Sequence, residues 1–322
     1  MNKKILCFLI LIIFLGAFLR FWSLGENGIG FFRDEAALGF NSWSILRSGA
    51  DEYGQKFPVF FRSFEVFFMP AYVYFSIPII AIFGISEFST RFISALSGTL
   101  LIYVTFLITR KIFSSDIVGF FASLVVSFSP WAIFYSRGAF EGNLGLFFFA
   151  SGVYFWLRFL ELNTKKLFLV SIGLFILSMY SYQAPRLVVP LFIFGSVILQ
   201  RKWHKKWKLW LLGLILSFIL YFPVINLFSQ PASYHRSLGV SLLTSQQQLP
   251  GYSTQLGDWQ KLYLIPREFL ALYLQYFSPY NLFWQGDYNR QLEVIGFSSF
   301  YFWLLPFFLG GIWSFFKNTS YL

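Results

Sequence analysis

The sequence predicts an all-α polytopic membrane protein, and three observations support this fold class. Of the 322 residues, 57% are hydrophobic and only 12% are charged, and the mean hydropathy is +0.62. The apolar residues form runs that are long enough to cross a bilayer as helices. The sequence does not show the alternating ten-residue segments of membrane β-strands, so helices are the predicted spanning elements.

Eight apolar runs are predicted to span the membrane. They cover residues 5–24, 87–113, 117–135, 144–160, 167–182, 187–199, 209–228 and 297–316. The first run is longer than the apolar core of a signal peptide and has no small-residue cleavage site, so we predict a retained span. A ninth run, Pro70–Gly84, has only 15 residues and contains Pro78, which is short of the usual minimum for a span.

The distribution of charge decides where the ninth run lies. If Pro70–Gly84 lies along the outer interface as a juxtamembrane helix, every basic cluster between spans falls on one side, which is then the cytoplasm. These clusters are Lys3/Lys4, Arg110/Lys111, Lys165/Lys166, residues 201–208 and Lys317. Only Asp116 and Glu161 share that side, and the other twelve of the fourteen acidic residues lie outside or at outer helix ends. The N-terminus is therefore predicted to be cytoplasmic, and function is expected in the long outer loops, residues 25–86 and 229–296.

Composition and motifs exclude several classes of protein. The formal charge of +11 is spread over short loop clusters rather than one patch, so no nucleic acid partner is expected. The single Cys7 excludes an internal disulfide or a cysteine-ligated metal site. The sequence has no Walker loop, GxGxxG, HExxH or CxxC motif, which argues against a cytosolic nucleotide enzyme. Because the chain ends soon after the eighth run without a polar tail, we expect it to be truncated at its C-terminus.

An acidic pair follows the first span. Asp34 and Glu35 come just after Phe31-Phe32 and begin a helical pattern that continues through Leu46. At a helix N-terminus the dipole and the unpaired N–H groups stabilise carboxylates. Such a pair would supply a general base and a neighbour that positions the substrate. Simple helix capping by surface acids explains the same pattern, so both interpretations stay open.

Three arginines are predicted at the outer ends of spans. Arg137 lies four residues before Glu141, Arg91 begins the second span, and Arg186 ends the turn Tyr180–Arg186. Guanidinium groups that converge at one depth suit a phosphate, because they make bidentate, charge-assisted hydrogen bonds. The alternatives are a surface i,i+4 ion pair for Arg137 and Glu141, and snorkelling of each arginine to lipid headgroups.

Taken in order, these motifs resemble the GT-C glycosyltransferase superfamily. The resemblance is to the protein O-mannosyltransferase-like group (family 39), which also includes bacterial aminoarabinose transferases. It is carried by Arg33-Asp34-Glu35, by residues 83–92 at the entry to the second span, and by the Ser-Pro…Tyr-Ser-Arg…Glu motif of residues 129–141. It covers most of residues 1–230. It implies a GT-C-like helix bundle with outer-face juxtamembrane helices in the plasma (inner) membrane.

The resemblance implies transfer of a sugar from a polyprenyl-phosphate-linked donor to a glycan, lipid or protein acceptor at the extracytoplasmic face. Asp34 would be the base that activates the acceptor. Glu35 and Glu141 would position a substrate or bind a divalent metal ion. Glu141 stands where the family usually has Asp, which leaves metal use open, and no other cofactor is expected. A transporter or flippase of lipid-linked sugars and a structural subunit are the alternative functions.

The resemblance also implies the residues that would hold substrate. Arg91, Arg137 and Arg186 would bind the donor phosphate and stabilise the charge of the leaving group. Arg33 and Tyr182 would be further substrate-binding residues. Membrane lipid is a further expected partner.

The topology makes one prediction that needs no substrate. A reporter fused after Lys111 is expected to be active only in the cytoplasm, because Arg110 and Lys111 belong to the predicted cytoplasmic clusters. The measurement is the paired activity of a cytoplasmic and a periplasmic reporter at this position. A periplasmic signal would place Pro70–Gly84 across the membrane and overturn the outer site.

Overall fold

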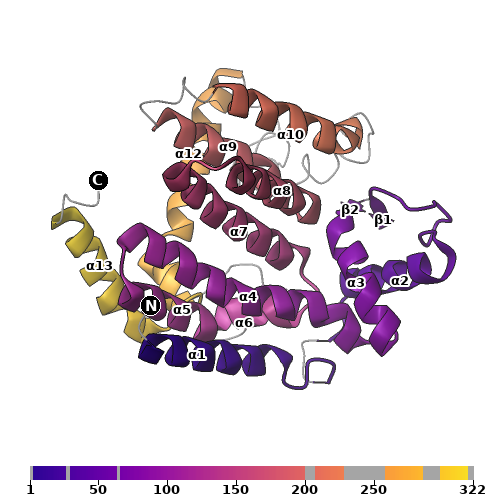
Figure 1. The fold of residues 1–322 in the computed structure, drawn as a ribbon, viewed down its shortest axis with the longest axis horizontal. Coiled ribbons are helices and arrows are strands. Elements are labelled where there is room, and N and C mark those ends of the chain that lie inside the picture. The colour runs from indigo at the N-terminus through magenta and orange to yellow at the C-terminus, as the bar shows by residue number, and fades with distance from the viewer. Residues whose placement is uncertain are drawn as a thin grey trace. The chain divides into compact units, whose positions relative to one another are not determined.

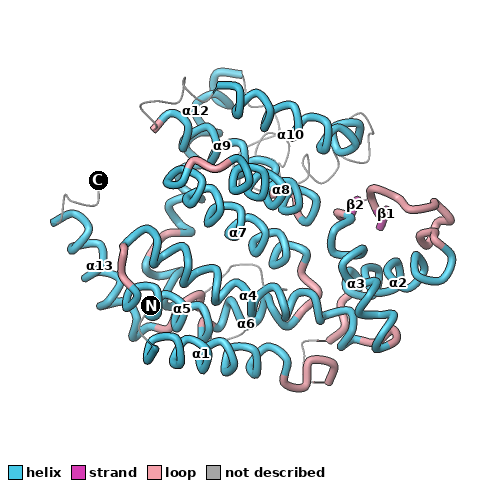
Figure 2. The backbone as a smooth tube through the Cα atoms, viewed as in Figure 1, coloured by secondary structure: helices cyan, strands magenta, loops and turns pink. Residues whose placement is uncertain are grey.

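The protein is described by a computed structural model for residues 3–26, 30–63, 66–199, 207–227, 258–285 and 298–317. Its chain forms two compact units: residues 1–63, 67–128 and 132–225 make the first, and residues 64–66, 129–131 and 226–322 make the second. Helices make up most of the described chain, as Figures 1 and 2 show. The predicted all-α fold class is confirmed.

The first unit holds all or most of ten helices. They are α1 (Lys3–Phe21), α2 (Arg33–Ser48), α3 (Pro70–Phe83), α4 (Glu87–Phe113), α5 (Asp116–Phe128), α6 (Pro130–Arg137), α7 (Glu141–Leu162), α8 (Lys165–Ser181), α9 (Pro185–Ile198) and α10 (Trp207–Leu227). Two short strands, β1 (Phe61–Ser63) and β2 (Val66–Phe68), pair with each other. The second unit contains α12 (Asp258–Tyr276), η3 (Asn281–Gln285), η4 (Phe302–Leu304) and α13 (Leu305–Lys317).

Each predicted span contains helix among its described residues, with one correction; residues 228 and 297, at the ends of two predicted spans, lie outside the described part. Among the described helices, α1, α4 and α7 are individually long and apolar enough to cross a membrane. The run predicted as a single span over residues 117–135 is instead two helices, α5 and α6, bent by 56° at the break between them. Pro130 explains the break, because proline cannot donate the backbone hydrogen bond that would continue the helix. The count of eight spans stays a prediction.

Local sequence signals explain where the helices near the N-terminus begin and end. The backbone N–H of Phe32 donates to the Glu35 carboxylate at 3.1 Å, which closes the first turn of α2 in the manner of a capping box. Gly49 ends α2 with a φ of 69°, a left-handed conformation that glycine adopts without steric cost. Ser86 caps α4 by accepting from the backbone N–H of Ser89 at 3.2 Å.

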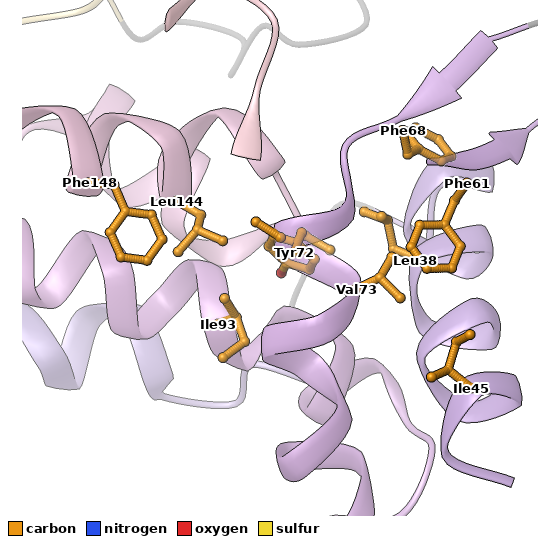
Figure 3. Packing of buried hydrophobic residues seen from close by; sticks show 11 residues of the cluster. Leu38, Ile45, Phe61, Phe68, Tyr72, Val73, Ile93, Leu144 and Phe148 are labelled. Carbon is orange, nitrogen blue, oxygen red and sulfur yellow. The ribbon is translucent and has the colours of Figure 1, made fainter. Parts of the chain in front are cut away.

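The ninth apolar run is the helix α3, and it forms the centre of a buried cluster. Tyr72 and Val73 of α3 are fully buried. Figure 3 shows side chains from α2, β1, β2, α4 and α7 gathered around them. The other labelled members are Leu38, Ile45, Phe61, Phe68, Ile93, Leu144 and Phe148. Burial of this apolar surface holds the start of α2 against α4 and α7. The position of α3 at the membrane interface stays a prediction.

Charged residues separate to the two ends of the paired helices α4 and α7. At one end Arg110 forms an ion pair with Asp116, and Lys111 forms one with Glu161. At the other end the Glu35 carboxylate binds both α4 and the turn before α7. The two helices therefore run in the same direction. The two acids predicted to be cytoplasmic lie beside the basic cluster Arg110/Lys111, at the opposite end from Glu35.

Small residues allow the helices to approach closely. A Cβ placed on Gly98 of α4 would lie 2.0 Å from Oγ of Ser136 and 3.1 Å from Nδ2 of Asn143. A Cβ on Gly16 of α1 would lie 2.5 Å from Oγ of Ser127. Helices in lipid associate through such close packing and through interhelical hydrogen bonds, because burial from water does not drive their association.

The contact at Gly98 predicts a specific sensitivity. Gly98→Val is expected to lower the free energy of unfolding by about 1–3 kcal/mol, because α4 and α6 must separate to admit the side chain. Thermal unfolding in detergent measures the loss. Gly173→Ala is the matched control, since a Cβ at Gly173 meets nothing within 4 Å. Equal stability of the two variants would contradict the close approach of α4 and α6.

Candidate functional site

The centre of the candidate site is a buried ion pair between Glu35 and Arg91. Nε of Arg91 donates to one carboxylate oxygen of Glu35 at 2.9 Å, and Nη2 donates to the other at 2.9 Å. The two side chains are 5% and 2% exposed. Nη1 of Arg91 also donates to the carbonyl of Leu24 at 3.2 Å and pairs with Glu87 at 3.2 Å. The guanidinium of Arg91 therefore binds protein oxygens and does not lie at an open surface.

The Glu35 carboxylate is also bound by backbone N–H groups. Phe32 donates to it from the start of α2, and Ala139 donates from the turn between α6 and α7 at 2.7 Å. A buried carboxylate is costly unless its oxygens accept hydrogen bonds and a cation lies nearby. Glu35 meets both requirements through groups from three separate elements. Glu35 therefore holds the start of α2 against α4 and against the turn between α6 and α7.

Asp34 has a different environment from its neighbour. Its side chain is 64% exposed, and Nε of the exposed Arg33 lies 3.8 Å from its carboxylate. Both residues lie in the first turn of α2. Burial of Glu35 orients this turn, so Asp34 is presented to the surroundings by a helix end that is held in place. The adjacent pair predicted from sequence thus divides into an anchored and an exposed carboxylate.

Arg137 binds the end of α1. Its Nη1 donates to the carbonyls of Leu19 at 3.0 Å and Trp22 at 2.9 Å, and its Nη2 lies 3.4 Å from the carbonyl of Ser23. The last carbonyls of a helix have no partner within the helix and carry partial negative charge, so a guanidinium is well placed there. The structure therefore shows Arg137 as a cap for α1. It does not show Arg137 and Arg91 turned together toward one open position.

Glu141 and Arg186 are linked through Met69. One carboxylate oxygen of Glu141 accepts the backbone N–H of Met69 at 3.0 Å, and Nη2 of Arg186 contacts the sulfur of the same residue. Arg186 lies within electrostatic range of both Glu141 and Tyr221. Arg186 is in the first turn of α9 and Glu141 in the first turn of α7. These two predicted residues are brought together from distant parts of the sequence.

Tyr182 packs against the start of α7. A Cβ placed on Gly142 would lie 3.7 Å from Cδ1 of Tyr182, and one on Gly145 would lie 3.1 Å from its Cβ. The two glycines leave room for the ring next to Glu141. Tyr182 therefore lies at the edge of the same group of residues, and its role in substrate binding stays a prediction.

Sequence reasoning missed Arg20. This residue lies in α1, is 0% exposed, and donates to Ser136, Gly16, Ser127 and Val126. The available signal was a single arginine inside an otherwise apolar predicted span, since ionisable residues in spans face protein rather than lipid.

The described residues contain no group of three or more His, Cys, Asp or Glu side chains that would hold a metal ion. Asp34, Glu35 and Glu141 each have their own set of partners. Binding of a divalent ion by Glu35 or Glu141 stays a prediction.

Comparisons with known proteins agree with this fold. A family model described as dolichyl-phosphate-mannose-protein mannosyltransferase matches residues 69–226. This segment includes Arg91, Arg137, Glu141 and Arg186, whereas Asp34 and Glu35 precede it. A search of curated protein sequences finds no match.

Solved structures share the fold at low sequence identity. Apo ArnT from Cupriavidus metallidurans matches with a TM-score of 0.56 and 16% identity, over 83% of this chain and 49% of ArnT. The archaeal oligosaccharyltransferase AglB from Archaeoglobus fulgidus, in complex with an inhibitory peptide and a dolichol-phosphate, matches with a TM-score of 0.53 and 15% identity, over 99% of this chain and 38% of AglB. The chain thus spans half or less of the length of these proteins. The chain therefore shares the fold of these GT-C membrane enzymes, and its residues 69–226 match the protein mannosyltransferase family model.

Proposed function

We propose that this protein is a membrane glycosyltransferase that transfers a sugar from a polyprenyl-phosphate-linked donor to an acceptor at the extracytoplasmic face. The family match over residues 69–226 and the GT-C fold support this function. A lipid-phosphate donor is further supported by the AglB structure, which contains a dolichol-phosphate. The location of the predicted acids and arginines at the end of α4 and α7 opposite Arg110/Lys111 supports the choice of face.

The observation that carries the proposal is the contrast between Asp34 and Glu35. Two adjacent carboxylates in different environments are suited to different roles. Glu35 is buried and bonded to Arg91 and Ala139, so it fixes the first turn of α2. Asp34 is exposed on that turn and takes the proton of the acceptor nucleophile. We therefore revise the role expected for Glu35 from direct substrate contact to positioning of Asp34.

Arg186 is the arginine we assign to the donor phosphate. Arg91 is bonded to Glu35 and Arg137 to the end of α1, which leaves them as positioning residues. Arg186 lies in the first turn of α9, beside Glu141 and Tyr221, and the dipole of a helix N-terminus favours an anion. When the bond between the sugar carbon and the phosphate oxygen breaks, the phosphate keeps the electron pair. A fixed guanidinium stabilises that developing charge.

The first prediction of this assignment concerns the base. Asp34→Asn is expected to lower the rate of sugar transfer by about 10²–10⁴-fold, because the amide cannot accept the proton of the acceptor. The rate is measured in membranes that contain the full chain, supplied with radiolabelled polyprenyl-phosphate sugars. The variant should unfold at the same temperature as the wild type, since Asp34 is exposed.

The matched control for Asp34→Asn is Glu26→Gln. Glu26 is an exposed carboxylate in the turn after α1, and its loss should leave the transfer rate unchanged. Full activity of Asp34→Asn beside an active wild type would remove Asp34 from the mechanism. Wild-type membranes that transfer no sugar from any donor supplied would contradict the proposed reaction itself.

The second prediction concerns the buried pair. Glu35→Gln is expected to lower the free energy of unfolding by about 3 kcal/mol, because Arg91 loses its buried counter-charge. Glu87→Gln removes the other carboxylate that pairs with Arg91, but its side chain is 43% exposed, so its cost should stay below about 1 kcal/mol. Unfolding in detergent compares the two variants. Equal losses would show that the Glu35–Arg91 pair does not organise the site.

A further inference from the structure

Arg20 is a buried cation whose acceptors are all neutral oxygens. Nε donates to the hydroxyl of Ser136 at 3.2 Å, and Nη1 donates to the carbonyls of Gly16 and Ser127, each at 3.0 Å. Nη2 donates to the carbonyl of Val126 at 3.0 Å. Among the ion pairs of the described residues, none includes Arg20. A fully buried guanidinium in a span is costly, so its bonds need a structural explanation.

Pro130 supplies that explanation. In an uninterrupted helix the residue at position 130 would donate its N–H to the carbonyl of Val126, four residues earlier, but proline has no N–H. Val126 and Ser127 lie in the last turn of α5, where carbonyls lack partners and carry the negative end of the helix dipole. Arg20 donates to both of these carbonyls. The partial negative charge at the end of α5 thus balances the charge of Arg20. In turn, Arg20 donates to the Val126 carbonyl, which Pro130 leaves without its helical N–H partner.

The bond between Arg20 and Ser136 extends this arrangement across the bend. Ser136 is near the end of α6, whereas Val126 and Ser127 are near the end of α5. One guanidinium therefore binds both arms of a helix pair that is bent by 56°. Arg137, the next residue after Ser136, donates in return to the carbonyls at the end of α1. Helix α1 and the bent pair are connected by an arginine in each direction.

The bend determines where the turn after α6 lies. Ala139 follows Arg137 by two residues, and its N–H donates to Glu35 at 2.7 Å. If α6 continued in line with α5, Ser136 and the turn after it would leave Arg20, and the N–H of Ala139 would leave Glu35. Helix α6, which has eight residues, connects the contact of Ser136 with Arg20 to the contact of Ala139 with Glu35.

We propose that Arg20 is a positioning residue: it holds the bend between α5 and α6, and the bend holds the amide of Ala139 against Glu35, beside the exposed Asp34. The structural part of this inference depends only on the contacts of Arg20. Its consequence for catalysis rests on the proposed function.

The test uses the missing N–H of Pro130. Arg20→Gln is expected to lower the melting temperature in detergent by about 5 °C or more, because three carbonyls, two of them at the end of α5, lose a charged donor. It should also raise the hydrogen-exchange rate of the Ala139 amide at least tenfold, as resolved to single residues by mass spectrometry. Adding Pro130→Ala supplies an N–H to Val126 and allows α5 to continue. The double variant should regain melting temperature while Ala139 stays rapidly exchanging and sugar transfer stays at least tenfold reduced.

This separation distinguishes positioning from a purely structural role. A purely structural arginine predicts that stability, amide protection and transfer recover together in the double variant, and that result would overturn the proposal. Pro130→Ala with Arg20 intact is the second variant in case Arg20→Gln does not fold. It should speed exchange at Ala139 in a folded protein, and unchanged exchange would also overturn the proposal.

One control variant and one measurement without substrate complete the experiment. Arg158→Gln is the matched control, because Arg158 lies in α7 near Tyr154 and Glu161, and it should leave exchange at Ala139 unchanged. The exchange measurement requires no substrate. If the wild type transfers no sugar, the proposed function fails while protection of Ala139 still decides the role of Arg20.

Discussion

The carboxylate of Glu35 is the group on which the organisation of this end of the protein depends. It accepts hydrogen bonds from the start of its own helix, from Arg91 of α4 and from the amide of Ala139 before α7. A buried charge has few tolerable arrangements, because each unsatisfied oxygen costs several times what a made bond contributes. Three elements that are far apart in the sequence are therefore held in one geometry, and the apolar cluster around Tyr72 packs the same helices together.

The second principle of the structure is the use of helix ends as counter-charges. Arg20 binds the terminal carbonyls of α5, and Arg137 binds those of α1. Among the described residues Arg20 forms no ion pair, and the buried Glu35 is paired with Arg91. Peptide dipoles at a helix C-terminus supply partial negative charge without the desolvation cost of a second ion. A break in a span, caused by Pro130, thereby becomes a binding site for a cation of the same chain.

The polar residues near the predicted site form two sets that differ in their partners. Glu35, Arg91 and Arg137 are bonded to protein groups that fix the helices. Asp34 is exposed beside them, and Arg186 lies with Glu141 and Met69 at the starts of α9 and α7. A transfer reaction needs a base and a cation held in place, and rigid elements hold such groups better than loops do. We assign the base and the phosphate-binding cation to Asp34 and Arg186. The positioning of the helices is assigned to Glu35, Arg91 and Arg137.

The sequence by itself determined the membrane class, the helical runs and their grouping of charge. Apolar runs and loop charges are one-dimensional patterns, and the two acids predicted to share a side with Arg110 and Lys111 do pair with them. A local signal also placed the start of α2, because a cap involves residues three apart. Only the tertiary structure decided which oxygens each arginine binds. The sequence predicted both Arg91 and Arg137 as phosphate ligands. In the structure Arg91 pairs with Glu35, 56 residues away, and Arg137 binds carbonyls at the end of α1. Arg20 was overlooked for the same reason: three of its four partners are backbone carbonyls, which every residue carries and which folding alone brings within reach.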